Sequence, residues 1–170
     1  GRLRPGFHPA DPPENMALGQ KIAASLPSYR IRPRRREDSQ QMADLQSQPG
    51  VFETMGTLPG LTPSLLENWY DGLDRYGHHL LVAEMLEGPD QNKAVAFANL
   101  FLHPNPRLAH KGEISLGVAS AYQAMGLGRK MMEAIIRVAE DWMGLQRLEL
   151  TVLSQNLAAQ ELYRSLGFVE

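Results

Sequence analysis

The chain of 170 residues contains no cysteine, which excludes disulfides, thiolate metal sites and a cysteine nucleophile. Any thiol in its chemistry must therefore arrive with a bound molecule. The net charge is only −2, so no overall basic field indicates a nucleic-acid partner. No apolar run approaches the roughly 18 residues of a membrane span, and prolines with charged residues interrupt the N-terminus where a signal peptide would be apolar. We expect a cytoplasmic protein with no nucleic-acid and no membrane partner.

The composition, with 43% hydrophobic and 21% charged residues, is typical of a globular protein, and the length suits one domain. Residues 1–15 differ from the rest because they are proline-rich and cannot form a regular element. We interpret them as a tag, a linker or a rearranged segment. The single domain is predicted over residues 16–170.

Apolar periodicity and turn signals predict a mixed α/β fold. Asp38 and Gln41 have the spacing of a capping box, and Thr62 followed by Pro63 is a typical helix start. One stripe of the long helix predicted over 126–143 should contain Leu127, Met131, Ile135, Val138 and Trp142. Strands are predicted over 29–34, 79–86, 94–102, 113–118 and 148–153, and helices over 18–25, 38–48, 62–76, 126–143 and from 156 onward.

The segment 118–129 joins an apolar strand to an amphipathic helix through Gly126 and Gly128. The first N–H groups of a helix lack partners and the helix dipole favours an anion, so this junction is suited to bind phosphate. The third glycine of the dinucleotide fingerprint is replaced by Met131, and the Lys-Ser/Thr pair of the P-loop is absent. A tight turn without a ligand is the other interpretation.

A second motif runs from Asn156 to Phe168. Asn156 is a good helix N-cap, and Gly167 is the expected C-terminal stop. Four residues share one face at helical spacing: Ala159, Leu162, Tyr163 and Leu166. Taken alone, this is also the pattern of an ordinary capped helix with a half-buried tyrosine.

Together, Gln123-x-x-Gly126-x-Gly128 and Asn156-x-x-Ala159-x-x-Leu162-Tyr163-x-x-x-Gly167-Phe168 resemble two signatures of the GCN5-related N-acetyltransferase (GNAT) superfamily. The likeness covers about residues 113–168 and is closest to small bacterial L-amino-acid N-acetyltransferases. It implies a GNAT-like acyl-CoA N-acyltransferase fold, with a mixed, mostly antiparallel central sheet flanked by helices on both faces.

The family usually adds two strands after the Gly-Phe pair, whereas this sequence stops at Glu170. We therefore expect the C-terminal strands to be truncated or displaced. Gly1–Arg4 resembles the segment that often follows the Gly-Phe pair in relatives. An exposed sheet edge would invite pairing. The edge should be covered by residues 1–8 or by a partner subunit, and frequent dimerisation in the family favours a homodimer.

The resemblance implies acetyl-CoA (coenzyme A) as the cofactor. The loop amides would hold its pyrophosphate, Gln123 would fix the loop, and the backbone of the preceding strand would pair with the pantetheine amides. Asn156 would contact the cofactor arm. The predicted cofactor-binding residues are Leu116, Val118, Gln123, Met125, Gly126, Leu127, Gly128, Arg129, Lys130 and Asn156. Arg129 has an alternative interpretation as a solvated helix residue.

Tyr163 is the predicted proton donor to the departing thiolate, because a phenol stays neutral near pH 7. Glu113 is the predicted base, acting through water, although a solvent-facing strand-end charge is equally consistent with its position. His103 is a further candidate, with a structural role as the alternative. The other histidines lack a metal-ligand pattern with acids, so no metal is predicted.

These residues predict an acetyl-CoA-dependent N-acetyltransferase that acts on the primary amine of a small molecule, an amino acid among the candidates, by direct attack in a ternary complex. Within residues 49–61, Phe52, Met55 and Leu58 either wall the acceptor site or cover the core. Protein N-termini and an antibiotic amine stay open as acceptors. A non-catalytic acyl-CoA sensor is the alternative from another class.

Overall fold

The computed structural model describes residues 25–51, 62–73 and 78–170, with the side chains of 70–73 left out. Most of the predicted helix 18–25, the proposed apolar wall at Phe52, Met55 and Leu58, and the proposed covering segment 1–8 lie outside the described residues. Those predictions therefore remain predictions.

Five strands form one sheet in the order β1-β2-β3-β4-β5. The strands are β1 (Tyr29–Pro33), β2 (His79–Met85), β3 (Ala94–Leu102), β4 (Lys111–Val118) and β5 (Arg147–Leu150). The first four pair antiparallel, and β5 pairs parallel to β4. The predicted mixed, mostly antiparallel sheet is confirmed, with element ends that differ by a few residues.

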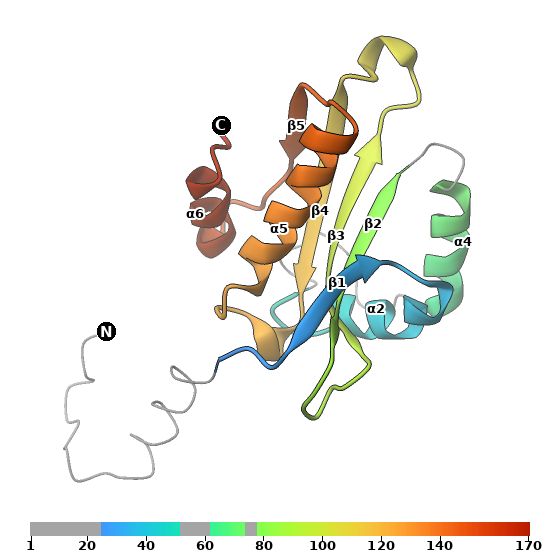
Figure 1. Cartoon of the computed structure of the whole chain (residues 1–170), viewed down its shortest axis with the longest axis vertical. Coiled ribbons are helices and arrows are strands. Elements are labelled where there is room, and N and C mark those ends of the chain that lie inside the picture. Colours follow the sequence, from blue (N-terminus) through green and yellow to red (C-terminus); the bar gives the residue numbers. More distant parts are fainter. Residues whose placement is uncertain (1–24, 52–61, 74–77) are drawn as a thin grey trace, which may run out of the picture.

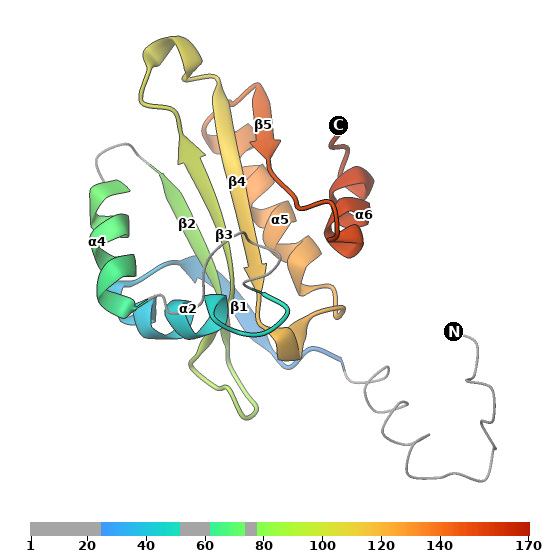
Figure 2. The same ribbon diagram turned by 180° about the vertical axis from the view of Figure 1, so that it is seen from behind.

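Figures 1 and 2 show helices on both faces of the sheet, with α2 and α4 on one face and α5 on the other. The helical elements are η1 (Arg36–Asp38), α2 (Ser39–Gln46), α4 (Pro63–Leu73), η3 (Pro106–Leu108), η4 (Ser120–Tyr122), α5 (Leu127–Arg137), the π-helical turn η5 (Val138–Trp142) and α6 (Leu157–Ser165). The expected fold class is thus confirmed.

The stripe of α5 packs into the core as predicted, since Leu127, Met131 and Ile135 have no exposed surface. The extension of this stripe to Trp142 is wrong, because that side chain is 82% exposed. The cause is the π-helical turn, in which the N–H of Met143 bonds to the carbonyl of Val138 five residues back. The longer step breaks the 3.6-residue periodicity on which the prediction rested.

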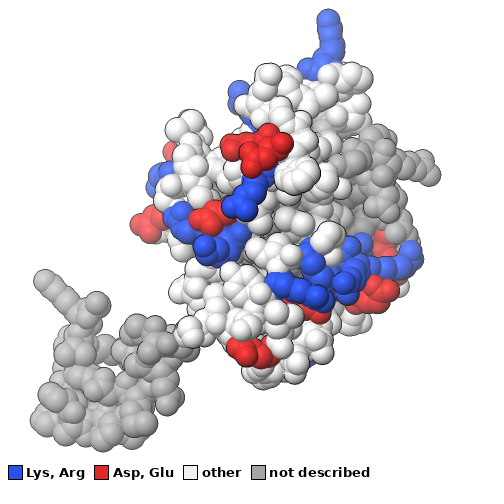
Figure 3. All heavy atoms as spheres, viewed as in Figure 1, with Lys and Arg blue, Asp and Glu red and all other residues white. Residues whose placement is uncertain are grey.

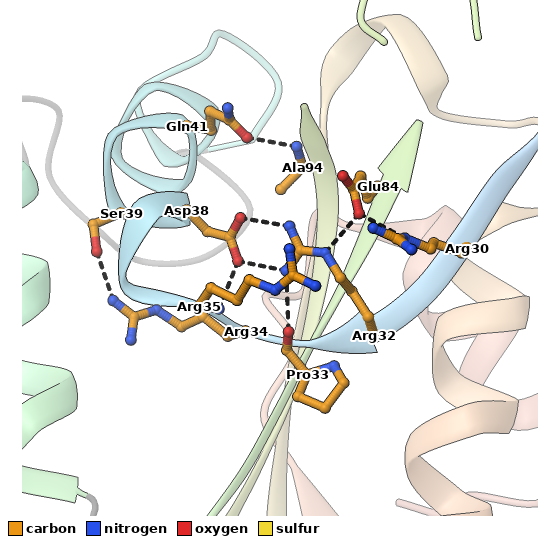
Figure 4. Close-up of polar contacts among 10 residues, drawn as sticks. All are labelled: Arg30, Arg32, Pro33, Arg34, Arg35, Asp38, Ser39, Gln41, Glu84 and Ala94. Carbon is orange, nitrogen blue, oxygen red and sulfur yellow. Dashed lines mark hydrogen bonds and ion pairs between the residues drawn. The ribbon is translucent and has the colours of Figure 1, made fainter. Parts of the chain in front are cut away.

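The predicted start of α4 is correct, because the Thr62 hydroxyl accepts the N–H of Leu65 at 3.3 Å. The predicted capping box at Asp38 is wrong. The Asp38 carboxylate accepts both terminal nitrogens of Arg32, at 2.7 and 2.8 Å, and the Gln41 amide oxygen accepts the N–H of Ala94 in β3 at 2.6 Å. Asp38 at the end of η1 and Gln41 in α2 therefore join these two helical elements to the sheet (Figure 4).

A buried ion-pair network lies between β1, β2 and η1. Arg32 binds Asp38 and also donates from Nε to Glu84 at 2.7 Å, and Arg30 donates to the same Glu84 oxygen. The side chains of Arg32, Asp38 and Glu84 are only 10%, 5% and 8% exposed. Figure 3 shows basic side chains gathered over β1 and η1 with acidic ones beside them. The arginine-rich segment 30–36 is thus largely paired within the fold.

The charges of this network shift the pKa of each carboxyl. Hydrogen bonds from Arg30 and Arg32 lower the pKa of Glu84 to about 2. Burial acts to raise the pKa of Asp38, but the bonds from Arg32 and from the N–H of Arg35 outweigh it and leave that pKa below its usual value. Both groups are therefore anionic at neutral pH.

Candidate functional site

The site begins where β4 and β5 part. β5 pairs with β4 only from Lys111 to Ile114, while β4 continues to Val118. The end of β4 therefore lacks a strand neighbour on that side among the described residues. A hollow of about 610 Å³ lies there, between the end of β4, the start of α5 and the helix α6.

The loop before α5 has the backbone form that an anion site requires. Gly126 is in the left-handed region with φ +86°, and a Cβ placed there would meet no atom within 4 Å. Ala124 is left-handed as well, with φ +60°, which is costly for a residue with a side chain. Gly126, Gly128 and Arg129 line the hollow, so the N-terminal end of α5 borders it.

Gln123 holds this loop in place. Its side-chain amide donates to the carbonyl of Val118 at 3.0 Å and to that of Gly50 at 3.2 Å. Ser120 strengthens the junction, because its hydroxyl donates to Pro49 and its N–H donates to Gln48. The segment after α2 is thereby tied to the end of β4, and Gly50 and Val51 reach the hollow from that side.

The opposite wall comes from α6. Asn156 caps this helix by accepting the N–H of Ala159 at 3.2 Å, as predicted, and lines the hollow. Tyr163 is half-buried, lines the hollow and packs edge-on against Phe168. Burial raises its pKa, so the phenol keeps its proton at neutral pH.

Arg129 connects the two helical walls, because its guanidinium donates to the hydroxyl of Ser165 on α6. The alternative interpretation of Arg129 as a solvated helix residue is therefore incomplete. The side chain remains exposed and lines the hollow, so it also lies where a phosphate could contact it.

The hollow brings together most of the predicted site residues: Leu116, Val118, Gln123, Gly126, Gly128, Arg129, Asn156 and Tyr163. Met125, Leu127 and Lys130 do not line it. The side chain of Leu127 is fully buried in the core, and Lys130 pairs with Glu133 at 3.6 Å. Any contact from these three residues to a ligand must come from the backbone, as the prediction assumed.

Glu113 is not brought into the same hollow as Tyr163. It is exposed and lines a second hollow of about 940 Å³, beside β5 and residues 166–170. On the sheet it lies directly beside Glu149. The other candidate base, His103, is exposed and accepts the N–H of Asn105 in a turn, which is a structural role.

Sequence reasoning missed part of the lining, namely Gly50, Val51, Gly117, Ala124, Ala158, Ala159, Glu161, Leu162 and Ser165. The residues on α6 follow from the helical spacing of the second motif. Gly50 and Val51 could not be found this way, because they come from a distant segment and reach the hollow only through the bonds from Gln123 and Ser120.

The sheet and the hollow together define an acyltransferase-like α/β fold with a site suited to an anionic ligand. The profile of the Acetyltransferase (GNAT) family matches residues 43–168. The chain belongs to this family, and its enzyme class is N-acetyltransferase.

Known proteins agree with this assignment. The chain is 26% identical over 139 residues to the L-amino acid N-acetyltransferase AaaT of Escherichia coli (strain K12), which covers 81% of each protein. It is 27% identical to an acetyltransferase of the GNAT family from Streptococcus pneumoniae, with a TM-score of 0.68 and coverage of 84% and 85%. YncA from Salmonella typhimurium, solved with its cofactor acetyl-CoA, shares the fold with a TM-score of 0.71, 22% identity and coverage of 84% and 80%.

None of the helices in the described part of the chain combines the length and the apolar character that crossing a membrane requires. Within residues 25–51, 62–73 and 78–170, no other strand pairs with the outer side of β5. The expected covering of that edge by residues 1–8 or by a partner subunit stays a prediction.

Proposed function

We propose that this N-acetyltransferase transfers an acetyl group from acetyl-CoA to the primary amine of a small molecule, by direct attack in a ternary complex. The observation that carries the proposal is the hollow at the parting of β4 and β5, because the start of α5, which is suited to bind an anion, and the half-buried phenol of Tyr163 both border it. The relative AaaT, named for L-amino acids, favours an amino acid as the acceptor.

The residues around the hollow fit the cofactor. Gly126 leaves open space at the start of α5, so a pyrophosphate can approach the N–H groups of residues 125–130. Among the described residues no strand pairs with the end of β4 on the β5 side, so Leu116 and Val118 can pair there with pantetheine amides as a sheet edge pairs with an added strand. Arg129 adds a positive charge at the rim.

Acetyl-CoA supplies the acetyl group as an activated thioester. In the proposed transfer, the amine nitrogen bonds to the acetyl carbon as the carbon–sulfur bond breaks. The Tyr163 hydroxyl gives its proton to the departing sulfur, and burial keeps that proton in place until then. The proton of the amine leaves through water to Glu113, which lies on the same face of β4 as Gly117 in the hollow.

The test is a thiol-release assay with acetyl-CoA and a panel of L-amino acids, polyamines and short peptides. We expect turnover with at least one small amine. Turnover with peptides alone would assign the chain to protein N-terminal acetylation. Acetyl-CoA binding without turnover would favour the sensor, which needs the loop but neither Tyr163 nor a base. A cytoplasmic location and a homodimer belong to the same proposal, and light scattering tests the second.

A further inference from the structure

One basic side chain at the rim of the hollow is held by a neutral partner. The guanidinium of Arg129, at the start of α5, donates from Nη2 to the hydroxyl of Ser165 on α6, 36 positions further along the chain. Both residues are exposed and line the hollow. Among the described residues, the side chain of Arg129 makes no other hydrogen bond and no ion pair. Its positive charge therefore remains available to a ligand.

The neighbouring basic residues are paired differently. Lys130 lies 3.6 Å from a carboxylate oxygen of Glu133, and Arg164 binds the carboxylate of Glu170 at 2.6 Å. Neither Lys130 nor Arg164 lines the hollow. A carboxylate partner offsets the charge of a cation, whereas a hydroxyl fixes the position of the cation and leaves its charge in place. Within the described part of the chain, the basic side chain that lines the hollow is thus one whose charge is not neutralised.

The hydroxyl of Ser165 is itself fixed in direction. It donates its proton to the carbonyl of Leu162, three residues back, at 2.6 Å, so its lone pairs accept from Arg129. This part of α6 also packs against the start of α5, because a Cβ on Gly128 would lie 3.6 Å from a methyl carbon of Leu162. The packing of the two helices therefore sets where Ser165 can hold Arg129.

We infer that Ser165 is a positioning residue, whose hydroxyl holds the guanidinium of Arg129 where it binds a phosphate group of acetyl-CoA. This inference rests on the proposed function, in which the pyrophosphate lies at the start of α5. A guanidinium has several N–H groups in one plane, so the bond to Ser165 leaves donors for a phosphate. An arginine that is already held loses less conformational freedom when the ligand binds, and this strengthens binding.

The carboxylate of Glu161 shows what a charged partner would do. Glu161 lies one turn before Ser165 on α6 and also lines the hollow, but it forms no ion pair with Arg129. A carboxylate bound to Arg129 would occupy its donors and repel the phosphate. The variant Ser165→Asp creates that arrangement, so it should weaken acetyl-CoA binding more than Ser165→Ala does.

The test measures the Kd for acetyl-CoA by calorimetric titration in Arg129→Ala, Ser165→Ala and the double variant. Arg129→Ala removes the phosphate contact and should weaken binding by about tenfold or more. Ser165→Ala removes only the restraint and should weaken binding roughly threefold to tenfold. The loss in the double variant should equal that in Arg129→Ala alone, because Ser165 acts through Arg129. Ser165→Thr keeps the hydroxyl and should bind like the wild type.

Arg164→Ala is the matched control, because it removes a positive charge from α6 at a position that does not line the hollow. It should bind acetyl-CoA like the wild type. Wild-type affinity in Ser165→Ala would overturn the inference. Losses that multiply in the double variant would also overturn it and assign Ser165 to holding α6 in place. Absence of acetyl-CoA binding by the wild type would instead contradict the proposed function itself.

Discussion

The two ends of the sheet use polar groups in opposite ways. At the β1 side, Arg32, Asp38 and Glu84 satisfy one another in a buried network (Figure 4). At the β4 side, the sheet parts and leaves a hollow beside the start of α5. At the first end, the charged side chains pair with one another and stabilise the fold. The second keeps hydrogen-bonding capacity for a ligand, so substitutions at the two ends should affect different measurements.

The largest effect on stability is expected at the β1 side. Glu84→Ala removes a carboxylate that binds both Arg30 and Arg32 and leaves a buried guanidinium with one partner less. The free energy of unfolding should fall by about 3–5 kcal/mol, as is usual when a buried ion pair is broken. Urea unfolding measures it.

The control for that variant is Glu67→Ala, which breaks a partly exposed pair with Arg36 whose N···O distance is 3.5 Å. It should cost less than about 1 kcal/mol. Equal losses in the two variants would show that the network does not stabilise the fold more than a surface pair does.

The same network predicts how stability depends on pH. Arg30 and Arg32 lower the pKa of Glu84 from 4.5 to about 2. The ionised carboxylate therefore contributes fully to the free energy of unfolding above about pH 4.5, and this contribution disappears as the pH falls toward 2. The contribution is up to about 3 kcal/mol. Urea unfolding between pH 7 and pH 3 should show a steeper loss in the wild type than in Glu84→Ala. Parallel curves would contradict this account.

At the other side of the sheet, Tyr163→Phe should act on turnover and not on folding. It removes one hydroxyl from the hollow, and turnover should fall by roughly tenfold to a thousandfold with nearly unchanged acetyl-CoA affinity. Tyr29→Phe, in β1, is the matched control and should keep full turnover. Wild-type rates in Tyr163→Phe would assign this tyrosine to packing.

The smallest effect concerns backbone strain in the loop. Ala124 has φ +60°, and glycine adopts that conformation without a steric cost. Ala124→Gly should therefore stabilise the protein by about 0.5 kcal/mol, after the greater freedom of glycine in the unfolded chain is subtracted. Ala109→Gly, at a right-handed position with φ −64°, should destabilise it by a similar amount. Thermal unfolding of both variants measures these changes. A lower stability of Ala124→Gly than of the wild type would contradict the proposed backbone strain.

The two ends of the sheet also differ in how far the sequence predicts them. Motifs encode local backbone, so the cap at Asn156, the left-handed Gly126 and the loop contacts of Gln123 could be predicted from residues that are close in sequence. Hydrophobic periodicity located all five strands. It failed at Trp142, where a π-helical turn changes the period.

Contacts between distant segments could not be predicted in this way. Arg32 and Glu84 are 52 positions apart, and Asp38 in isolation looks like a helix cap. The approach of Gly50 to the hollow and the register that sets Asn99 beside Ser115 likewise depend on how strands align. A single sequence gives the pattern of each strand but not which residue faces which.

The central claim is that acetyl-CoA binds at the start of α5, and calorimetric titration of two glycine variants with acetyl-CoA tests it most directly. Gly126 and Gly144 both have positive φ and open space around an added Cβ, but only Gly126 lines the hollow. Gly126→Val and Gly144→Val should thus carry similar backbone strain. We predict that Gly126→Val weakens acetyl-CoA binding at least tenfold while Gly144→Val binds like the wild type. Equal affinity in both variants would contradict the assignment of the site.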